Sequence, residues 1–268
     1  PRDEARGAVA AAHAAGVRVL MITGDHPRSA IAIARELGIA DANDTDAVTG
    51  AGLDLLDDTA LRDLAARRHV FARTSPEHKL KLVRALKAGG AIVAMTGDGV
   101  NDAPALRAAD IGIAMGITGT DVSKDAADMV LADDNFASIV AAIEEGRSIY
   151  ANIRKFLRYL LSTNLGEVLV LFLGVVLAAA LGIGADTGET LLLPLTATMV
   201  LWINLVTDSF PALAVGVDPL DRTLMRRPPR VASEGVISKR MWIGIGVASV
   251  VMASGTLGLL DAGLPGGL

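Results

Sequence analysis

The chain has 268 residues, of which 51% are hydrophobic, and it carries a net charge of −5. This composition allows a large buried core, and the mild acidity leaves no electrostatic footprint for nucleic acid as a partner. The absence of cysteine excludes disulfides and thiolate metal sites. Because the chain begins with Pro-Arg-Asp-Glu, without a Met or a signal segment, we expect a fragment of a longer protein.

The apolar residues are unevenly distributed and predict two domains. Residues 1–147 are charged, rich in alanine and soluble in character, whereas residues 148–268 contain long apolar runs. We expect the first part to be a soluble-type domain and the second a transmembrane domain.

Helical and strand patterns alternate along the first domain. They predict helices over residues 4–15, 27–37, 61–66, 76–88 and 103–108, the start of another at 121, and strands over 17–22, 70–72, 91–95 and 111–114. Ser75 and Pro76 set the start of the helix over 76–88, as a cap and a first-turn proline. This alternation predicts an α/β, doubly wound and mostly parallel sheet. Residues 41–58 are acidic and predict a surface excursion without assigned chemistry.

The segment Met95–Leu106, MTGDGVNDAPAL, carries the clearest chemical signal. It follows a predicted buried strand and places Asp98 and Asp102 four residues apart on a glycine-rich turn. A second Thr-Gly-Asp turn, at residues 23–25, also follows a strand, so we expect both turns at one edge of the sheet. Two carboxylates there can hold Mg²⁺, which usually binds together with a phosphate. The alternative is an acidic surface turn whose glycines serve only geometry.

Other polar residues at the predicted strand tips and helix starts suit phosphoryl transfer. Lys79 can place a positive charge on phosphoryl oxygens, and Thr23 and the Gly24 amide can donate to them. Asp25 is as compatible with a turn or capping role as with a catalytic one, and Lys79 alone with a solvated helix lysine. No strand in the chain offers an Asp-Lys-Thr-Gly turn, so the nucleophile is absent.

Three predicted spans make up the second domain. They cover about residues 148–183, 191–217 and 237–260, each longer than the roughly 20 residues that cross a bilayer. The loop between the first two spans carries only acidic charges, Asp186 and Glu189, while basic residues flank the other ends: Arg154, Lys155, Arg158, Arg222, Arg226, Arg227, Arg230, Lys239 and Arg240. The positive-inside rule therefore places residues 1–147 in the cytoplasm.

Polar side chains inside these spans predict a cation path. Asn164 and Glu167 lie in the first span, and Asn204, Thr207 and Asp208 lie in the second. Ionisable residues within spans are costly and usually face a cation path or a partner. Oxygen ligands of this kind suit a hard cation such as Ca²⁺, and Gly166, Pro194 and Pro211 can free backbone carbonyls nearby. The alternative for the two asparagines is hydrogen bonding between helices.

Nearly the whole chain resembles the C-terminal half of a calcium-transporting P-type ATPase, of the type found in sarcoplasmic reticulum and in bacteria. The matching stretches are MITGD, ARTSPEHKLKLV, MTGDGVNDAPAL, ADIGIAMG, MVLADDNFASIVAAIEEGRSIYANIRKFLRYLLSTNLGEV, LWINLVTDSFPA and DRTLMRRPPR. The resemblance implies a haloacid-dehalogenase-like phosphorylation domain followed by a helical transmembrane domain.

The resemblance also assigns roles to individual residues. It implies that Thr23, Gly24 and Asp25 lie on the phosphate and nucleotide side of the site, and that Lys79 contacts the phosphoryl group. It further implies that Asp98 binds Mg²⁺, that Asn101 and Asp102 belong to the network of phosphate and water, and that Arg73 lies near the nucleotide. The residues that it implies as ligands of the transported cation are Asn164, Glu167, Asn204, Thr207 and Asp208. The phosphorylated aspartate, the nucleotide-binding and actuator domains, the first four helices and the last three lie outside this chain.

The resemblance therefore implies the C-terminal part of an ATP-driven pump that exports Ca²⁺ from the cytoplasm through an aspartyl-phosphate intermediate. Such a pump uses Mg²⁺ and ATP and works in a lipid bilayer, here a prokaryotic plasma membrane. The fragment is not expected to pump without the upstream part of the same chain. The alternatives are transport of Mn²⁺, Na⁺ or H⁺, a membrane-tethered haloacid-dehalogenase-like phosphatase, and a truncated product that only binds partners.

Overall fold

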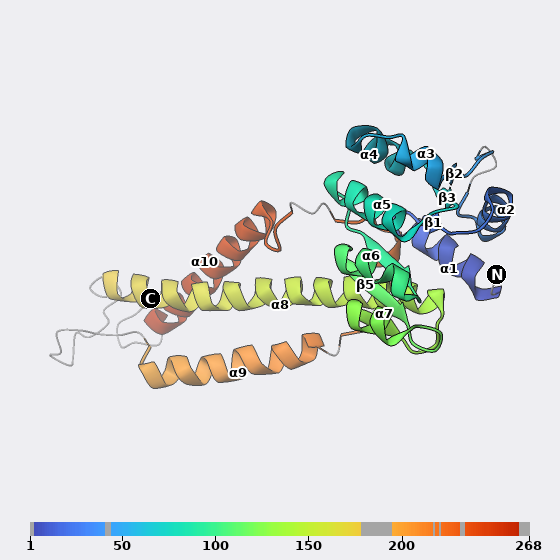
Figure 1. Ribbon diagram of the computed structural model, residues 1–268. Helices are drawn as coiled ribbons and strands as arrows, with labels where there is room; N and C mark the ends of the chain where they lie inside the picture. The colour runs from blue at the N-terminus through green and yellow to red at the C-terminus, as the bar shows by residue number, and fades with distance from the viewer. Residues whose placement is uncertain are drawn as a thin grey trace. The chain divides into compact units, whose positions relative to one another are not determined.

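The computed structural model describes residues 3–40, 44–177, 195–216, 218–219, 221–230 and 234–262 (Figure 1). The chain forms two compact units, Pro1–Gly146 with Asp221–Ala232, and Arg147–Leu220 with Ser233–Leu268. The segment Asp221–Ala232, between the second and third predicted spans, thus groups with the first unit. Residues 178–194 and 217, where two predicted spans end or begin, lie outside the described residues, as do Asp186, Glu189 and Pro194.

The first unit is built from short helices and parallel strands. Its helices are α1 (Asp3–Ala14), α2 (Pro27–Leu37), α3 (Gly50–Asp54), α4 (Asp58–Arg67), α5 (Pro76–Ala88), α6 (Ala103–Ala108) and α7 (Asp121–Ala126), with single 3₁₀ turns η1 (Val100–Asp102) and η2 (Arg222–Arg226). Its strands are β1 (Met21–Ile22), β2 (Val48–Thr49), β3 (Val70–Ala72), β4 (Ala94–Gly97), β5 (Ile111–Met115) and β6 (Met129–Leu131).

The strands form two parallel sheets of three strands, in the orders β1-β3-β2 and β4-β5-β6. The parallel α/β pattern is confirmed, but the expectation that both Thr-Gly-Asp turns follow strands of one sheet is wrong for the described residues. β1 pairs only with β3, and β4 pairs only with β5, so each turn follows the edge strand of a separate sheet. β3 is the centre of its sheet and all three of its residues are buried.

Capping residues account for the helices that were predicted most accurately. α2 begins at Pro27 after the N-cap His26, and Gly38, with φ 77°, ends it in the left-handed conformation. α5 begins at Pro76 after Ser75, whose side chain forms a capping box with His78. Local chemistry of this kind acts without tertiary contacts, so sequence patterns detect it.

Three predictions need correction. The excursion over 41–58 contains β2 and α3, which are too short to show a period. The strand predicted over 17–22 forms only at Met21–Ile22. The long helix predicted to begin near Ser148 begins at Phe136 as α8, where the Asn135 side chain accepts a hydrogen bond from the Ala137 amide at 2.9 Å.

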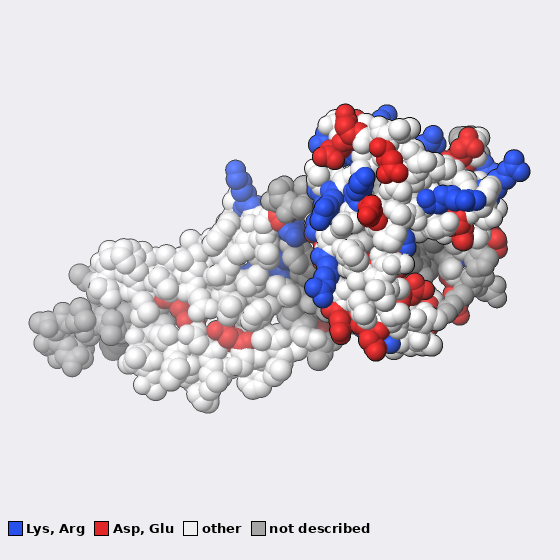
Figure 2. Space-filling model, viewed as in Figure 1, with Lys and Arg blue, Asp and Glu red and all other residues white. Residues whose placement is uncertain are grey.

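The second unit contains the apolar helices. α8 (Phe136–Val176), α9 (Ala197–Gly216) and α10 (Lys239–Ala262) are each long and apolar enough to cross a membrane, by length and composition. Figure 2 shows blue and red side chains interspersed over the first unit, and mostly white surface over these helices. α8 is continuous over 41 residues, so its first turns belong to the first unit and the rest to the second.

Candidate functional site

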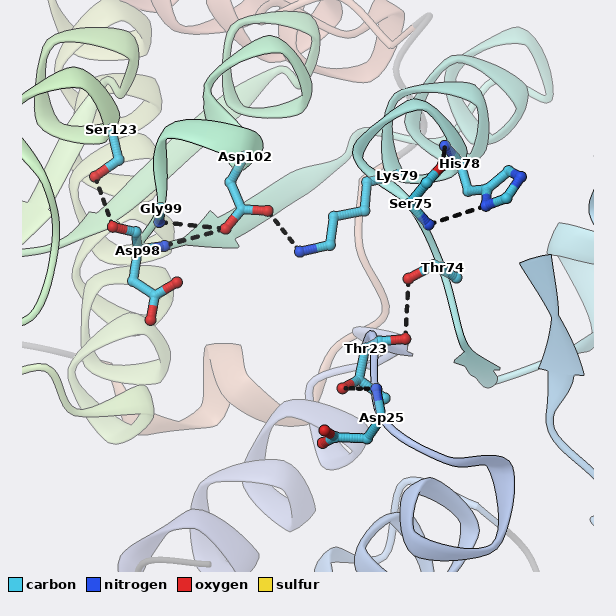
Figure 3. Close-up of polar contacts among 10 residues, drawn as sticks. All are labelled: Thr23, Asp25, Thr74, Ser75, His78, Lys79, Asp98, Gly99, Asp102 and Ser123. Atoms are coloured by element: carbon cyan, nitrogen blue, oxygen red, sulfur yellow. Dashed lines mark hydrogen bonds and ion pairs between the residues drawn. The ribbon is translucent and has the colours of Figure 1, made fainter.

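Asp102 is the centre of the polar group at the end of β4. Its side chain is only 7% exposed, and one carboxylate oxygen accepts a hydrogen bond from Lys79 Nζ at 2.5 Å. The other oxygen accepts from the amides of Asp98 and Gly99, at 3.3 and 3.4 Å (Figure 3). Both oxygens are therefore engaged by the protein, and Asp102 holds the Lys79 ammonium in place.

The start of α5 positions Lys79 between the two Thr-Gly-Asp turns. The Thr74 hydroxyl and amide both donate to the Thr23 carbonyl, at 3.0 and 3.1 Å, which joins the turn after β1 to the residues before α5. One turn further on, Lys79 reaches Asp102 in the turn after β4. Figure 3 shows the Lys79 side chain lying between these two groups of residues.

The Asp98 carboxylate is the one best placed to bind Mg²⁺. Its backbone carbonyl accepts from Ser123 Oγ at 3.2 Å and from the Thr120 amide at 2.9 Å, which fixes the main chain. The carboxylate itself turns away from Asp102 (Figure 3). No group of three or more His, Asp or Glu side chains that could hold a metal exists among the described residues. This donor set fits Mg²⁺, which commonly binds one or two carboxylates together with substrate phosphate and water.

The remaining predicted residues of this group are less constrained. The Thr23 hydroxyl accepts from the Asp25 amide at 3.1 Å, and Gly24 and Asp25 are exposed at the tip of the turn. Asn101 is exposed on η1. Arg73 is also exposed, with a left-handed φ of 51°, and its amide donates to the Asp25 carbonyl at 3.1 Å. The structure thus brings the two turns and Lys79 into one region of the first unit.

Two residues that support the site, His78 and Asp134, were not among those predicted from the sequence. His78, on α5 beside Lys79, accepts from the Ser75 amide through Nδ1 at 3.0 Å, and its Nε2 lies 2.9 Å from an Asp54 carboxylate oxygen. Because Nδ1 accepts, Nε2 carries the proton and donates to Asp54, and this hydrogen bond lowers the pKa of Asp54. The Ser75 cap could have pointed to His78 as the N3 residue of the helix, but only the folded chain brings Asp54 to it.

The second missed residue is Asp134, in the turn before α8. It is 8% exposed and accepts from the Ile117 amide at 2.9 Å and from the amide and hydroxyl of Thr118, both at 2.8 Å. These hydrogen bonds lower the pKa of Asp134 to about 2, and the one from the Ile117 amide has the largest effect. Asp134 therefore anchors the loop after β5, whose next residues include Thr120, the donor to Asp98. Nothing in the sequence around Asp134 indicates this role, because its partners lie 16 and 17 residues earlier.

A second polar group lies on α8 and α9. With the Asn204 amide oriented so that its nitrogen faces the carboxylate, that nitrogen lies 2.9 Å from both oxygens of Glu167. Asp208 lies four residues after Asn204, hence on the same face of α9, and its Oδ1 is buried with no hydrogen-bond partner among the described residues. Oxygen-bearing side chains from two helices thus meet within the segments predicted to span the membrane.

The other two predicted ligands hydrogen-bond within their own helices. Asn164 Nδ2 donates to the Leu160 carbonyl at 2.9 Å, and the Thr207 hydroxyl donates to the Ile203 carbonyl at 2.8 Å. The Thr207 carbonyl accepts from the Tyr159 hydroxyl at 2.8 Å, which joins α9 to α8.

Most of the chain is similar to known proteins. Residues 1–110 match the family model of the haloacid dehalogenase-like hydrolases, and residues 192–266 match that of the cation transporting ATPase C-terminus. A calcium-transporting ATPase of Bacillus cereus is 52% identical over 238 residues, which cover 89% of this chain and 25% of that protein. The chain belongs to the P-type cation-transporting ATPases.

Other P-type ATPases show the same extent of similarity. A calcium-transporting ATPase of Bacillus subtilis is 49% identical over 90% of this chain and 26% of its own length. Human calcium-transporting ATPase type 2C member 1 is 42% identical over 96% of this chain and 27% of its own length. A solved zinc-transporting PIB-type ATPase has a TM-score of 0.48 and 31% identity, over 80% of this chain and 26% of that one.

Two statements about this P-type ATPase chain follow from these similarities. The prediction of a haloacid-dehalogenase-like domain followed by helices that can span a membrane is confirmed. The chain spans about a quarter of the length of the curated relatives that it matches.

Proposed function

We propose that this chain is the C-terminal part of an ATP-driven pump that exports Ca²⁺ from the cytoplasm through an aspartyl-phosphate intermediate. The observation that carries the proposal is the contact between Glu167 on α8 and Asn204 on α9, with Asp208 one turn further along the same face of α9. Carboxylate and amide oxygens are ligands that Ca²⁺ prefers. The buried Asp208 oxygen has no hydrogen-bond partner among the described residues, so it is available as a ligand atom. The similarity to calcium-transporting ATPases supports the same ion.

On the phosphoryl side, the chain supplies charge and positioning. Lys79, held by Asp102, offers a fixed positive charge to the oxygens of a phosphoryl group, while the Thr23 hydroxyl and the Gly24 amide donate to them. When bound at Asp98, Mg²⁺ would neutralise charge that develops on the phosphate. Asn101 and Asp25 would hold water and phosphate at the rim, and Arg73 would lie on the nucleotide side.

The nucleophile would come from the rest of the pump. Among the described residues, β1 and β4 each pair with one neighbour, which leaves the other edge of each strand without a partner there. A parallel strand that pairs with either edge would end beside these turns, because parallel strands end at the same side of a sheet. We propose that the upstream part of the protein supplies this strand together with the phosphorylated aspartate.

On the transport side, Ca²⁺ is the cargo. Glu167, Asn204 and Asp208 would bind it, and Asn164 and Thr207 would join once their side chains leave the carbonyls of their own helices. α8 begins in the first unit and carries Glu167, so one rigid helix would connect ion occupancy with phosphorylation. Protons taken up by the emptied carboxylates would serve as counter-ions.

The proposed location is a prokaryotic plasma membrane, with residues 1–147 in the cytoplasm. The apolar lengths of α8, α9 and α10 and the basic residues at their ends support this orientation. The partners would be the lipid bilayer and the upstream domains, with no role for nucleic acid.

The test is ATP-dependent formation of an acid-stable phosphoenzyme by the complete pump in membranes, with Ca²⁺, Mn²⁺, Na⁺ or Mg²⁺ alone. We expect labelling that requires Ca²⁺ and is lost in Asp208→Ala, while the control Asp261→Ala, at the end of α10, labels normally. Labelling driven by Mn²⁺ or Na⁺ alone would reassign the ion. Phosphatase activity without labelling, unchanged in Asp208→Ala, would replace the pump with a membrane-tethered phosphatase.

A further inference from the structure

The helices α8 and α10 pack against each other in the same direction. Along α8, Ser162, Gly166 and Val170 recur every four residues, and the buried residues of α10 also recur every four: Met241, Ile245, Ser249, Ala253 and Leu257. Ser249 Oγ donates to the Ser162 carbonyl at 2.9 Å, and Val170 packs with Ala253 and Leu257. Later residues of α8 thus meet later residues of α10, so the N-terminal end of α10 lies beside the α8 turn that precedes Ser162.

That turn carries Arg158, whose guanidinium lies across Gly244 of α10. A Cβ atom at Gly244 would be 3.3 Å from Arg158 Nη2, 3.7 Å from Cζ and 3.8 Å from Nε. Three atoms of the guanidinium thus lie within 4 Å of that position. The absence of a side chain at position 244 therefore makes room for the Arg158 guanidinium.

The guanidinium has no acceptor in the parts of the chain that the structure describes. The Arg158 side chain is exposed, and the hydroxyl of Ser162 donates to its backbone carbonyl, not to its side chain, at 2.7 Å. Lys155, three residues earlier on α8, is instead paired with Asp218 at 2.6 Å. A guanidinium offers five donors in a fixed plane that matches phosphate or carboxylate geometry.

The surroundings of Arg158 combine positive charge with apolar surface. Arg240 lies four residues before Gly244, hence on the same face of α10, and is exposed like its neighbour Lys239. Trp242 is 52% exposed, and Ile243 and Val247 are also exposed on this part of the helix. Basic residues and a tryptophan at the end of an apolar helix are typical of the interface between lipid headgroups and acyl chains.

We propose that Arg158 and Arg240 bind the phosphate of an anionic phospholipid, with Gly244 as the floor of the site and the exposed residues of α10 against the acyl chains. The proposal rests on the proposed membrane placement of α8 and α10, and not on the transported ion or on ATP. A lipid phosphate is favoured over free phosphate because the apolar surface beside the guanidinium gives acyl chains a surface to contact.

The test is retention of lipid by the complete pump, purified in neutral detergent and titrated in native mass spectrometry. The probes are phosphatidylglycerol and phosphatidylcholine with identical acyl chains. We expect a preference for phosphatidylglycerol that falls about tenfold in Arg158→Gln, as for loss of one charge-assisted hydrogen-bonding group. Gly244→Val should reduce this preference similarly, because the valine side chain fills the floor of the site, although the charge of Arg158 is kept. Arg158→Lys should keep part of it, since the charge stays and the planar fork is lost.

Lys155→Gln is the matched control, since it removes one positive charge from the same helix at a residue that already has a partner. It should retain the preference. Equal loss in Lys155→Gln and Arg158→Gln, or equal retention of both lipids by the unmodified pump, would overturn the proposal. Displacement of phosphatidylglycerol by millimolar inorganic phosphate would also overturn it, in favour of a free-anion site. Lipid retention is measured without ATP or Ca²⁺, so failure of the proposed pump function would leave this result interpretable.

Discussion

At the scale of single residues, Asp102 depends on the glycines around it. Gly97, the last residue of β4, lies against the Asp102 side chain, and a Cβ there would be 2.5 Å from Asp102 Cβ. Gly99, two residues later, would place a Cβ 3.9 Å from the nearest atoms. A side chain at position 97 would therefore clash with Asp102, whereas one at position 99 would fit, so Gly99 is a suitable control for Gly97.

We expect Gly97→Ala to displace Asp102 and with it Lys79, and to lower the rate of phosphoenzyme formation by about 100-fold, since small misplacements at reacting groups are costly. Gly99→Ala is the control and should keep the rate within a few-fold. Rapid-quench labelling of the complete pump measures both. Equal rates in the two variants would show that the close packing of Gly97 against Asp102 is unimportant.

His78 allows its two contacts to be separated. Gln at this N3 position can still accept from the Ser75 amide in a capping box, whereas Ala cannot. We expect His78→Ala to lower the free energy of unfolding by about 1–2 kcal/mol, and His78→Gln to lower it by about half as much, because only the Asp54 contact is lost. Chemical denaturation monitored by circular dichroism checks this order, and equal losses would contradict the capping role.

At the scale of elements, α8 and α10 are in contact at a buried hydroxyl. Ser249 is fully buried and donates to the carbonyls of Ser162 and Ile245. A hydrogen bond between membrane helices contributes about 0.6 kcal/mol, whereas a bulky side chain in a packed interface costs about 1–3 kcal/mol.

We therefore expect Ser249→Ala to be nearly neutral and Ser249→Leu to lower the thermal unfolding temperature of the detergent-solubilised pump. Light-scattering or tryptophan-fluorescence melts measure the difference. A melt for Ser249→Leu that matches the unmodified protein would mean that the two helices are not held at this contact.

At the scale of the whole molecule, three carboxylates of the first unit make its stability depend on pH. Hydrogen bonds from the Ile117 and Thr118 amides lower the pKa of Asp134 to about 2. The pKa of Asp110 is lowered mainly by a hydrogen bond from the Val93 amide, and the pKa of Asp54 is lowered mainly by its hydrogen bond with His78. A carboxyl whose folded pKa lies below its unfolded value stabilises the fold above the unfolded pKa, and this stability is lost as pH falls through the folded pKa.

We expect the unfolding temperature to fall steadily between about pH 4 and pH 2, the range between the ordinary carboxyl pKa and that of Asp134. In Asp134→Asn, unfolding should begin at a lower temperature at neutral pH, and the remaining fall below pH 4 should be shallower. Calorimetry across this pH range gives both slopes. Parallel curves for the two proteins would exclude Asp134 as an acid-sensitive anchor of the loop after β5.

Local chemistry explains which elements could be predicted from the sequence. Ser75 with Pro76 set the start of α5, and Gly38 ends α2, through contacts within one helical turn. Apolar runs long enough to cross a bilayer are equally visible, since length and composition suffice. β2 and α3 were missed, because elements of two and five residues are formed by pairing with β3 and by packing, not by their own pattern.

The sequence by itself determined the α/β class, the apolar helices, and which residues carry oxygen ligands and charge, because these properties reside in single residues and their spacing. Only the tertiary structure decided that Lys79 engages Asp102, that Glu167 meets Asn204 across two helices, and that Arg158 lies over Gly244. It also separated the strands into two sheets and brought Asp134 to the loop after β5. The physical reason is that each of these contacts joins residues from different elements, and their meeting depends on how those elements pack.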